Sequence, residues 1–187
     1  MEPHQTNEAS YWNSVAMAGL LFGLIVFAVN IIGGYMTIQT ESADTLMAES
    51  MIAGLLSCLI GAFGGLMAVK YYVKEYPQPL LIGRGAVIGL ATGVVIALVF
   101  SVLSLLWNVI DPAYTENLME STIANIEAMG LNEAQQQDMI DSIAEQMQQM
   151  QTTGGVLMAF GMNALLYGIL NLLTGMLGVK FFAPHED

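Results

Sequence analysis

The side chains best placed to do chemistry inside the long apolar stretches of this chain are three asparagines, Asn30, Asn163 and Asn171. An amide donates and accepts hydrogen bonds without carrying a charge, so the three side chains could line a path for a neutral or weakly polar solute. Such amides also join neighbouring helices, each bond contributing about 0.6 kcal/mol where lipid surrounds them. We expect the joining role, and solute binding is the alternative.

No pattern typical of catalysis or of a cofactor site occurs in the sequence. The middle of every apolar stretch lacks Asp, Glu, Lys, Arg and His, which argues against a proton-driven carrier. A metal site near the chain ends would have only two histidine ligands, His4 and His185, and the single cysteine, Cys58, lies within an apolar stretch. We therefore predict a protein that is not an enzyme and that binds no cofactor or metal.

Four stretches that are free of charge in their centres position these residues. They run over residues 14–36, 50–72, 86–107 and 155–179. About 20 helical residues cross the hydrocarbon core of a bilayer, so each stretch is long enough to span it. Charged residues make up 11% of the chain, against about a quarter in soluble domains. The sequence predicts an all-α integral membrane four-helix bundle that forms a single membrane domain over residues 1–187.

The basic residues indicate how such a bundle would be oriented. All four lie next to the predicted spans, at the end where the chain would also begin and finish: Lys70, Lys74, Arg84 and Lys180. Cytoplasmic loops retain Lys and Arg, so these residues predict that both termini are cytoplasmic. The net charge of −12 is concentrated in the loops on the opposite side. Such a surface repels nucleic acid, which we exclude as a partner.

The chain also looks duplicated. Four residues of the first span match four residues of the third at a constant offset of seventy: Ala16, Gly19, Leu20 and Gly23 with Ala86, Gly89, Leu90 and Gly93. Each half of the chain would then be a helical hairpin that starts and ends at the same membrane face. The bundle is therefore predicted to consist of two parallel helical hairpins.

Residues 109–154 are too long for an unstructured loop between the third and fourth spans. Asp111 followed by Pro112 is typical of a helix start. Gly130 can end that helix in a left-handed conformation, and Asn132 with Gln135 resembles a capping box that opens another. The segment is rich in Asp and Glu and has no basic residue. We predict an external acidic helical hairpin with a solvated surface, and attraction of a basic partner or weak cation binding is the alternative.

Rows of small residues predict where the spans pack closely, because close contact drives helix association in lipid. The glycines lie at steps of four residues in the first three spans and at steps of seven in the fourth. The predicted helix-packing residues are Gly19, Gly23, Gly61, Gly65, Gly85, Gly89, Gly93, Gly161, Gly168 and Gly175. We expect them to face helices of the same chain. A second copy or another membrane protein is the alternative.

The run Ile110-Asp111-Pro112-Ala113-Tyr114, followed after a helix by Gly130-Leu131-Asn132-Glu133-Ala134-Gln135, resembles one bacterial family. That family comprises four-span membrane proteins known only as a domain of unknown function, and it is common in Bacteroidota-type bacteria. The likeness extends over nearly the whole chain, which departs from the usual pattern by its few lysines and its short turn at 73–83. The resemblance implies the bacterial cytoplasmic (inner) membrane and supplies no catalytic residue.

The predicted function is accordingly a non-enzymatic structural or interaction role, such as that of an assembly or accessory subunit. The expected partners are membrane lipids, with a homo-oligomer or a membrane protein as further possibilities. The alternative function is a small transporter or channel for a neutral or weakly polar solute, lined by the three asparagines.

Overall fold

The computed structural model describes residues 10–39, 46–150 and 152–184 of the chain. This part of the chain is all-helical, as predicted, and it contains no strand. Its six helices are α1 (Trp12–Gln39), α2 (Leu46–Glu75), α3 (Ile82–Ile110), α4 (Tyr114–Ala128), α5 (Glu133–Met150) and α6 (Thr153–Phe182). His4, His185 and residues 40–45 of the first external link lie outside the described residues.

Four of the helices, α1, α2, α3 and α6, are long and apolar enough to cross a membrane. Each extends two to four residues beyond the predicted apolar stretch at both ends, because backbone hydrogen bonding continues past the last apolar side chain. Gly83 and Arg84 consequently belong to α3. The turn between α2 and α3 is therefore shorter than the predicted 73–83, and it contains Pro77 and Pro79.

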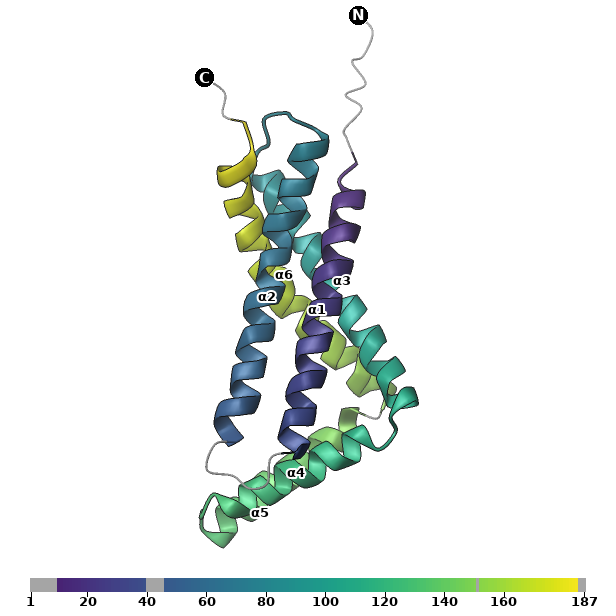
Figure 1. Cartoon of the computed structure of the whole chain (residues 1–187), viewed down its shortest axis with the longest axis vertical. Coiled ribbons are helices and arrows are strands. Elements are labelled where there is room, and N and C mark those ends of the chain that lie inside the picture. The colour runs from purple at the N-terminus through teal and green to yellow at the C-terminus, as the bar shows by residue number, and fades with distance from the viewer. Residues whose placement is uncertain (1–9, 40–45, 151, 185–187) are drawn as a thin grey trace, which may run out of the picture.

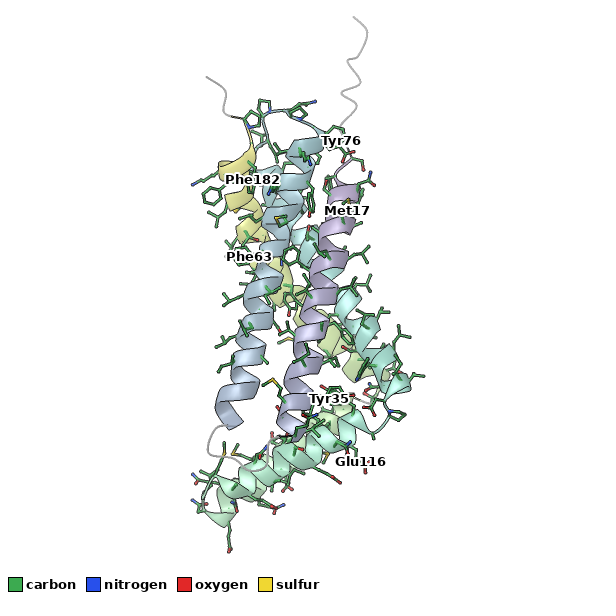
Figure 2. The ribbon with its side chains drawn as sticks, viewed as in Figure 1. Met17, Tyr35, Phe63, Tyr76, Glu116 and Phe182 are labelled. Carbon is green, nitrogen blue, oxygen red and sulfur yellow. The ribbon has the colours of Figure 1, made fainter. Side chains whose placement is uncertain are left out.

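The four long helices form one bundle, and α4 and α5 cross one end of it (Figure 1). Helices α1 and α3 run toward that end, and α2 and α6 run back. The start of α1, the α2–α3 turn and the end of α6 therefore lie together at the opposite end. Large apolar side chains such as Met17 and Phe63 point outward (Figure 2), as expected for helices that face lipid.

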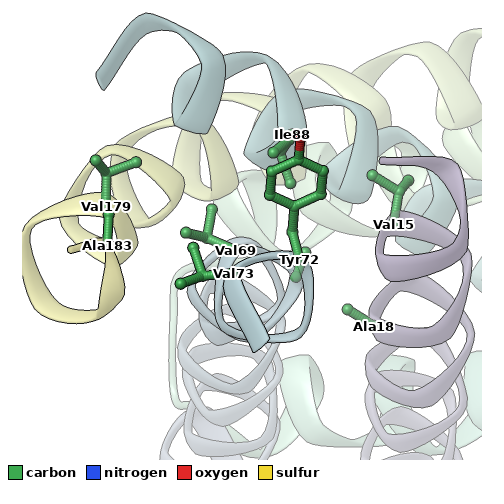
Figure 3. Close-up of a cluster of buried hydrophobic side chains, with 9 residues drawn as sticks. Val15, Ala18, Val69, Tyr72, Val73, Ile88, Val179 and Ala183 are labelled. Carbon is green, nitrogen blue, oxygen red and sulfur yellow. The ribbon is translucent and has the colours of Figure 1, made fainter. Parts of the chain in front are cut away.

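The best-buried apolar side chains lie at the end of the bundle where the chain begins and finishes. One cluster there draws side chains from all four long helices (Figure 3): Val15, Ala18, Ala68, Val69, Tyr72, Val73, Ile88, Val179 and Ala183. A smaller second cluster comprises Val26, Ile96, Ala97 and Tyr167. The four long helices are thus locked together over this half of the bundle.

Glycines allow α6 to approach α2 and α3 at backbone distance. A Cβ atom at Gly89 of α3 would collide with the backbone carbonyl of Asn171, and one at Gly93 would collide with the backbone carbonyl of Tyr167. A Cβ atom at Gly65 of α2 would also meet the Asn171 carbonyl. Because no side chain separates the backbones, α6 packs against two neighbours along these residues.

The same contact continues toward the end of α6. A Cβ atom at Gly85 would collide with the Val179 side chain, and one at Gly175 would collide with the carbonyl of Gly85. A Cβ atom at Gly61 of α2 would meet the ring of Tyr167. Gly168 is less tightly enclosed, since a Cβ atom there would lie 3.2 Å from Leu90.

The glycines of α1 meet a different kind of partner. A Cβ atom at Gly19 would lie 2.7 Å from the Cβ of Val95, and one at Gly23 would lie 2.7 Å from the Cβ of Val99, both on α3. Although Gly19 and Gly23 match Gly89 and Gly93 in sequence, they receive valine side chains, whereas the α3 pair receives the backbone of α6. The sequence repeat does not extend to equivalent contacts at these positions.

Gly161 does not make the helix contact that was predicted for the row of glycines along α6. No atom lies within 4 Å of a Cβ built at this position, so Gly161 does not pack against another helix among the described residues. The buried residues of α6 all lie between Tyr167 and Val179. The first half of the helix has no buried residue, although Phe160 and Ala164 pack against the second cluster, and the seven-residue spacing did not indicate a contact of Gly161 within the described residues.

We predict that Gly89→Ala destabilises the protein by about 1–3 kcal/mol, the usual cost of adding a methylene to a filled contact. The new methyl group would strike a backbone carbonyl, which has little freedom to move. The matched control is Gly161→Ala, whose methyl group meets no neighbour. Unfolding of both variants in mixed micelles measures the difference, and equal stability of the two would contradict the contact.

Candidate functional site

Asn171 joins α6 to α2 in the half of the bundle where the chain begins and finishes, called here the closed half. Its side chain is fully buried. The amide nitrogen donates to the carbonyls of Gly61 (3.0 Å) and Tyr167 (2.8 Å), and the amide oxygen accepts from the backbone N–H of Gly65 at 2.5 Å. Gly61 and Gly65 are one helical turn apart, so a single amide bonds to the carbonyl at the start of that turn and to the N–H at its end. Asn171 is thereby committed to holding the two helices together.

Thr174 adds a further bond between the same two helices. Its hydroxyl group donates to the carbonyl of Ala62 at 2.6 Å and lies 3.2 Å from the carbonyl of Asn171. Polar groups are costly to leave unpaired in an apolar interior. The hydrogen bonds of Asn171 and Thr174 satisfy this requirement and leave their side chains with a structural role.

Asn30 lies in the other half of the bundle, on α1. Its amide nitrogen donates to the carbonyl of Val26 and to the hydroxyl oxygen of Ser57, both at 2.8 Å. The bond to Ser57 joins α1 to α2. Unlike Asn171, Asn30 is only partly buried and lines a cavity.

This partly open cavity, called here the outer cavity, has a volume of about 520 Å³ and is lined by residues of α1, α2, α3 and α4. Aromatic side chains form much of its wall: Phe27, Phe100, Trp107 and Tyr114. Its polar lining residues are Asn30, Thr37, Ser104, Asn108 and Thr122. No residue of α6 is among the described residues that line the cavity. The outer cavity is a candidate binding site, because it combines aromatic walls with several polar groups.

An aromatic cluster fastens α4 to the bundle beside the outer cavity. The ring of Tyr35 lies 5.1 Å from that of Tyr114 and 6.4 Å from that of Trp107, between ring centroids. Phe27 meets Trp107 edge-on at 5.9 Å. Burial, with the nearby Tyr35 and Asp111, raises the pKa of Tyr114 above its ordinary value. The Tyr114 hydroxyl group is therefore protonated at neutral pH.

Asp111 does not have the predicted role of a helix cap. The hydroxyl group of Tyr35 donates to its carboxylate at 2.5 Å, and α4 begins only at Tyr114, with Ala113 at the N-cap position and no side-chain capping bond. Asp111 instead ends α3, its backbone N–H bonding to Trp107. Pro112 consequently lies in the turn between the helices. The Asp111 carboxylate accepts from the Tyr35 hydroxyl group on α1, and this bond takes the place of a capping bond to the backbone of α4.

The other local signals in the hairpin are confirmed. Gly130 has a φ of 65°, the left-handed conformation expected after a helix. Asn132 accepts from the backbone N–H of Gln135 at 2.9 Å, and its amide donates to the Gln135 side chain at 2.8 Å. A cap that we did not predict is Thr152, which accepts from the N–H of Gly155 at the start of α6. Its signal was the first of the two threonines that precede the glycine pair.

Asn163 lies apart from the other two asparagines. It borders a separate hollow between α5 and α6 that is also lined by Gln146, Gln149 and Met158. Asn171 is fully enclosed by protein, and Asn30 alone of the three lines the outer cavity. The described residues therefore do not form the shared polar path that the alternative function required, because helical spacing placed the three amides on different surfaces.

The four basic residues lie at the end of the bundle where the chain begins and finishes. Lys70 and Lys74 are near the end of α2, Arg84 is in the first turn of α3, and Lys180 is in the last turn of α6. The Lys70 ammonium lies 5.6 Å from the Phe182 ring centroid, and the Arg84 guanidinium lies 5.6 Å from that of Tyr72. Figure 2 places Tyr76 and Phe182 at this end. Aromatic and basic side chains are typical of helix ends at a membrane surface.

Four long apolar helices, outward-facing apolar side chains and this aromatic and basic end define an integral membrane protein. The family described as Protein of unknown function (DUF4199) matches residues 18–179, so the chain belongs to that family. The resemblance to a domain of unknown function is thereby confirmed. No match was found among curated proteins or among solved structures.

We predict that Asn171→Leu lowers the free energy of unfolding by about 2 kcal/mol, the sum of three average hydrogen bonds in a membrane protein. Leucine has the same branched shape but bulkier methyl groups, so their crowding against Gly61 and Gly65 would add to the loss of the polar contacts. Asn163→Leu is the matched control, because this half-buried side chain borders the hollow between α5 and α6 and not the contact with Gly61 and Gly65. Reversible unfolding in mixed micelles measures both variants. A loss no greater for Asn171→Leu than for Asn163→Leu would contradict the structural role.

Proposed function

We propose that this protein is a non-enzymatic interaction protein whose membrane bundle holds the α4–α5 hairpin in a fixed position for a partner. The observation that carries the proposal is the surface of that hairpin. All seven of its carboxylate side chains are exposed: Glu116, Glu120, Glu127, Glu133, Asp138, Asp141 and Glu145. The sequence supplies no basic residue between them. A partner with a basic surface would complement this charge.

The spacing of the carboxylates supports an organised surface. At about 100° per residue, Glu116, Glu120 and Glu127 lie within about 40° of one another around α4. Asp138, Asp141 and Glu145 lie within about 60° around α5. Figure 2 shows Glu116 at the same end of the bundle as Tyr35, whose bond to Asp111 anchors the start of the hairpin.

The packing within the chain favours the hairpin over the glycine rows as the binding surface. Gly65, Gly85, Gly89, Gly93 and Gly175 already face other helices of this chain. These small-residue surfaces are therefore occupied before any partner arrives. Lipid would cover the outward apolar side chains, which leaves the acidic hairpin as the surface available to a partner in water.

A small transporter or channel is the second candidate function, and the outer cavity with Asn30 is the observation that favours it. The other half of the bundle argues against it, since Asn171 and the glycine contacts fill that region. Saturable flux of a neutral solute through proteoliposomes of the intact protein, lost on closing the outer cavity, would establish transport and overturn the interaction role.

We further propose that the protein lies in the bacterial cytoplasmic membrane with Lys70, Lys74, Arg84 and Lys180 on the cytoplasmic side. The rule that cytoplasmic loops retain Lys and Arg supports this orientation. The hairpin would then face the periplasm, where its partner would be a soluble protein or the external part of a membrane protein.

A photo-crosslinking residue at Ala124, which is exposed on α4 beside the acidic face, tests the interaction. We expect an adduct of defined mass in native membranes. Replacing Glu116, Glu120 and Glu127 by Gln should reduce its yield several-fold, because the attraction to a basic surface is lost. A crosslinker at Gln78, in the turn at the opposite end, is the control. No adduct at Ala124, or one indifferent to the replacements, contradicts the proposal.

Cysteine labelling in intact cells checks the orientation. In a Cys58→Ala background, a cysteine at Ser142 of α5 should react with a membrane-impermeant maleimide, whereas a cysteine at Gln78 should react only after lysis. Both positions are exposed, so their reactivity depends on the side of the membrane. The reverse pattern would place the basic end outside.

A further inference from the structure

The outer cavity has the dimensions of a binding site for a small organic molecule. Its volume of about 520 Å³ falls within the roughly 300–1,000 Å³ typical of ligand pockets. Apolar and aromatic walls with a few polar groups are also typical of such sites. The cavity is partly open, so a ligand could reach it without separating the helices of the closed half.

The polar groups deep in the outer cavity offer hydrogen-bond acceptors. Asn30 uses its amide nitrogen on Val26 and Ser57, and its oxygen makes no bond within the described part of the chain. The Ser104 hydroxyl group donates to its own helix at Phe100, which leaves oxygen lone pairs available. Asn30 lies two helical turns, roughly 10 Å, further into the bundle than Thr37. A ligand that pairs with the oxygens of Asn30 and Ser104 must therefore bring a donor.

The charge of the lining excludes ions. Among the described lining residues, none is charged at neutral pH. A charged ligand would lose its hydration without finding an opposite charge, and this loss is costly in an apolar environment. The aromatic walls formed by Phe27, Phe100 and Trp107 favour a flat or compact apolar body.

We propose that the outer cavity binds a compact, uncharged, mainly apolar molecule that carries a hydroxyl or N–H donor, which it presents to Asn30 and Ser104. This binding site goes beyond the interaction role of the hairpin. It requires neither the acidic surface nor a partner protein, so either proposal can fail without the other.

Trp107 makes the proposal directly measurable, because it lines the outer cavity and the chain has only one other tryptophan, Trp12. In a Trp12→Phe variant reconstituted in nanodiscs, the fluorescence lifetime of Trp107 reports an approaching bromine atom. The probes are para-bromobenzyl alcohol and its methyl ether, which differ in the hydroxyl donor. Their concentrations are expressed as mole fractions in the bilayer.

Two leucine substitutions separate the cavity from the surrounding lipid. Gly54 lines the outer cavity, and a Cβ atom there meets nothing within 4 Å, so Gly54→Leu should fill the space without strain. Gly161 has equally free surroundings on α6, outside the cavity lining, and Gly161→Leu is the matched control. Thermal unfolding and gel filtration verify that both variants fold.

We expect saturable quenching by the alcohol, with half-saturation at about fivefold lower concentration than for the ether, the effect of one neutral hydrogen bond. Gly54→Leu should abolish the saturable component, Gly161→Leu should retain it, and Asn30→Leu should remove the preference for the alcohol. Quenching that rises linearly with probe concentration and is the same in the Gly54→Leu variant would overturn the site. Saturable quenching with equal affinity for both probes would overturn the required donor.

Discussion

The close approach of α6 to α2 and α3 is the constraint on which the rest of the structure depends. Apolar side chains gain little by leaving lipid for a helix interface, so association in a membrane requires close packing and paired polar groups. Gly65 and Gly89 face the backbone carbonyl of Asn171, and the Asn171 side chain bonds to α2 at the same point. One residue of α6 therefore provides both the surface that the glycines fit and the hydrogen bonds that fix the register of the helices.

The position of this contact explains why the two halves of the bundle differ. The buried residues of α6 run from Tyr167 to Val179, so its first half contributes no buried residue. The outer cavity consequently has walls from α1, α2, α3 and α4 alone. The bond between Tyr35 and Asp111 holds α4 across this open half. A firmly packed half thus supports a half that retains space for a ligand.

The sequence was sufficient for properties that depend on neighbouring residues. Uncharged length predicted the four long helices, and short-range patterns predicted the left-handed Gly130 and the capping pair that begins with Asn132. Contacts between distant residues were not predictable in this way. Asn30, Asn163 and Asn171 have similar apolar surroundings in sequence, yet one lines a cavity, one borders a surface hollow and one is fully enclosed.

Asp111 shows the same limit within a single motif. The Asp-Pro pair is typical of a helix start, and nothing near it in sequence reveals that Tyr35 donates to its carboxylate from another helix. The carboxylate that would cap the helix accepts from Tyr35 instead, and no side-chain capping bond forms at the start of α4. The glycine rows have a similar ambiguity. They indicated that helices approach closely, but they did not reveal that Gly19 meets the side chain of Val95 whereas Gly89 meets the backbone of Asn171.

Beyond the bond between Tyr35 and Asp111, the contacts between α4 and α5 depend little on charge. Its carboxylates have no basic residue within residues 109–154 to pair with, and like charges on one helix face repel. The hairpin is held instead by uncharged contacts: Gly130 permits the turn, Asn132 caps α5, and the Gln136 amide donates to the carbonyl of Glu127 at the end of α4. The exposed carboxylates of α4 and α5 thus have no basic side chain within the hairpin to pair with, and these uncharged contacts offset the repulsion between them.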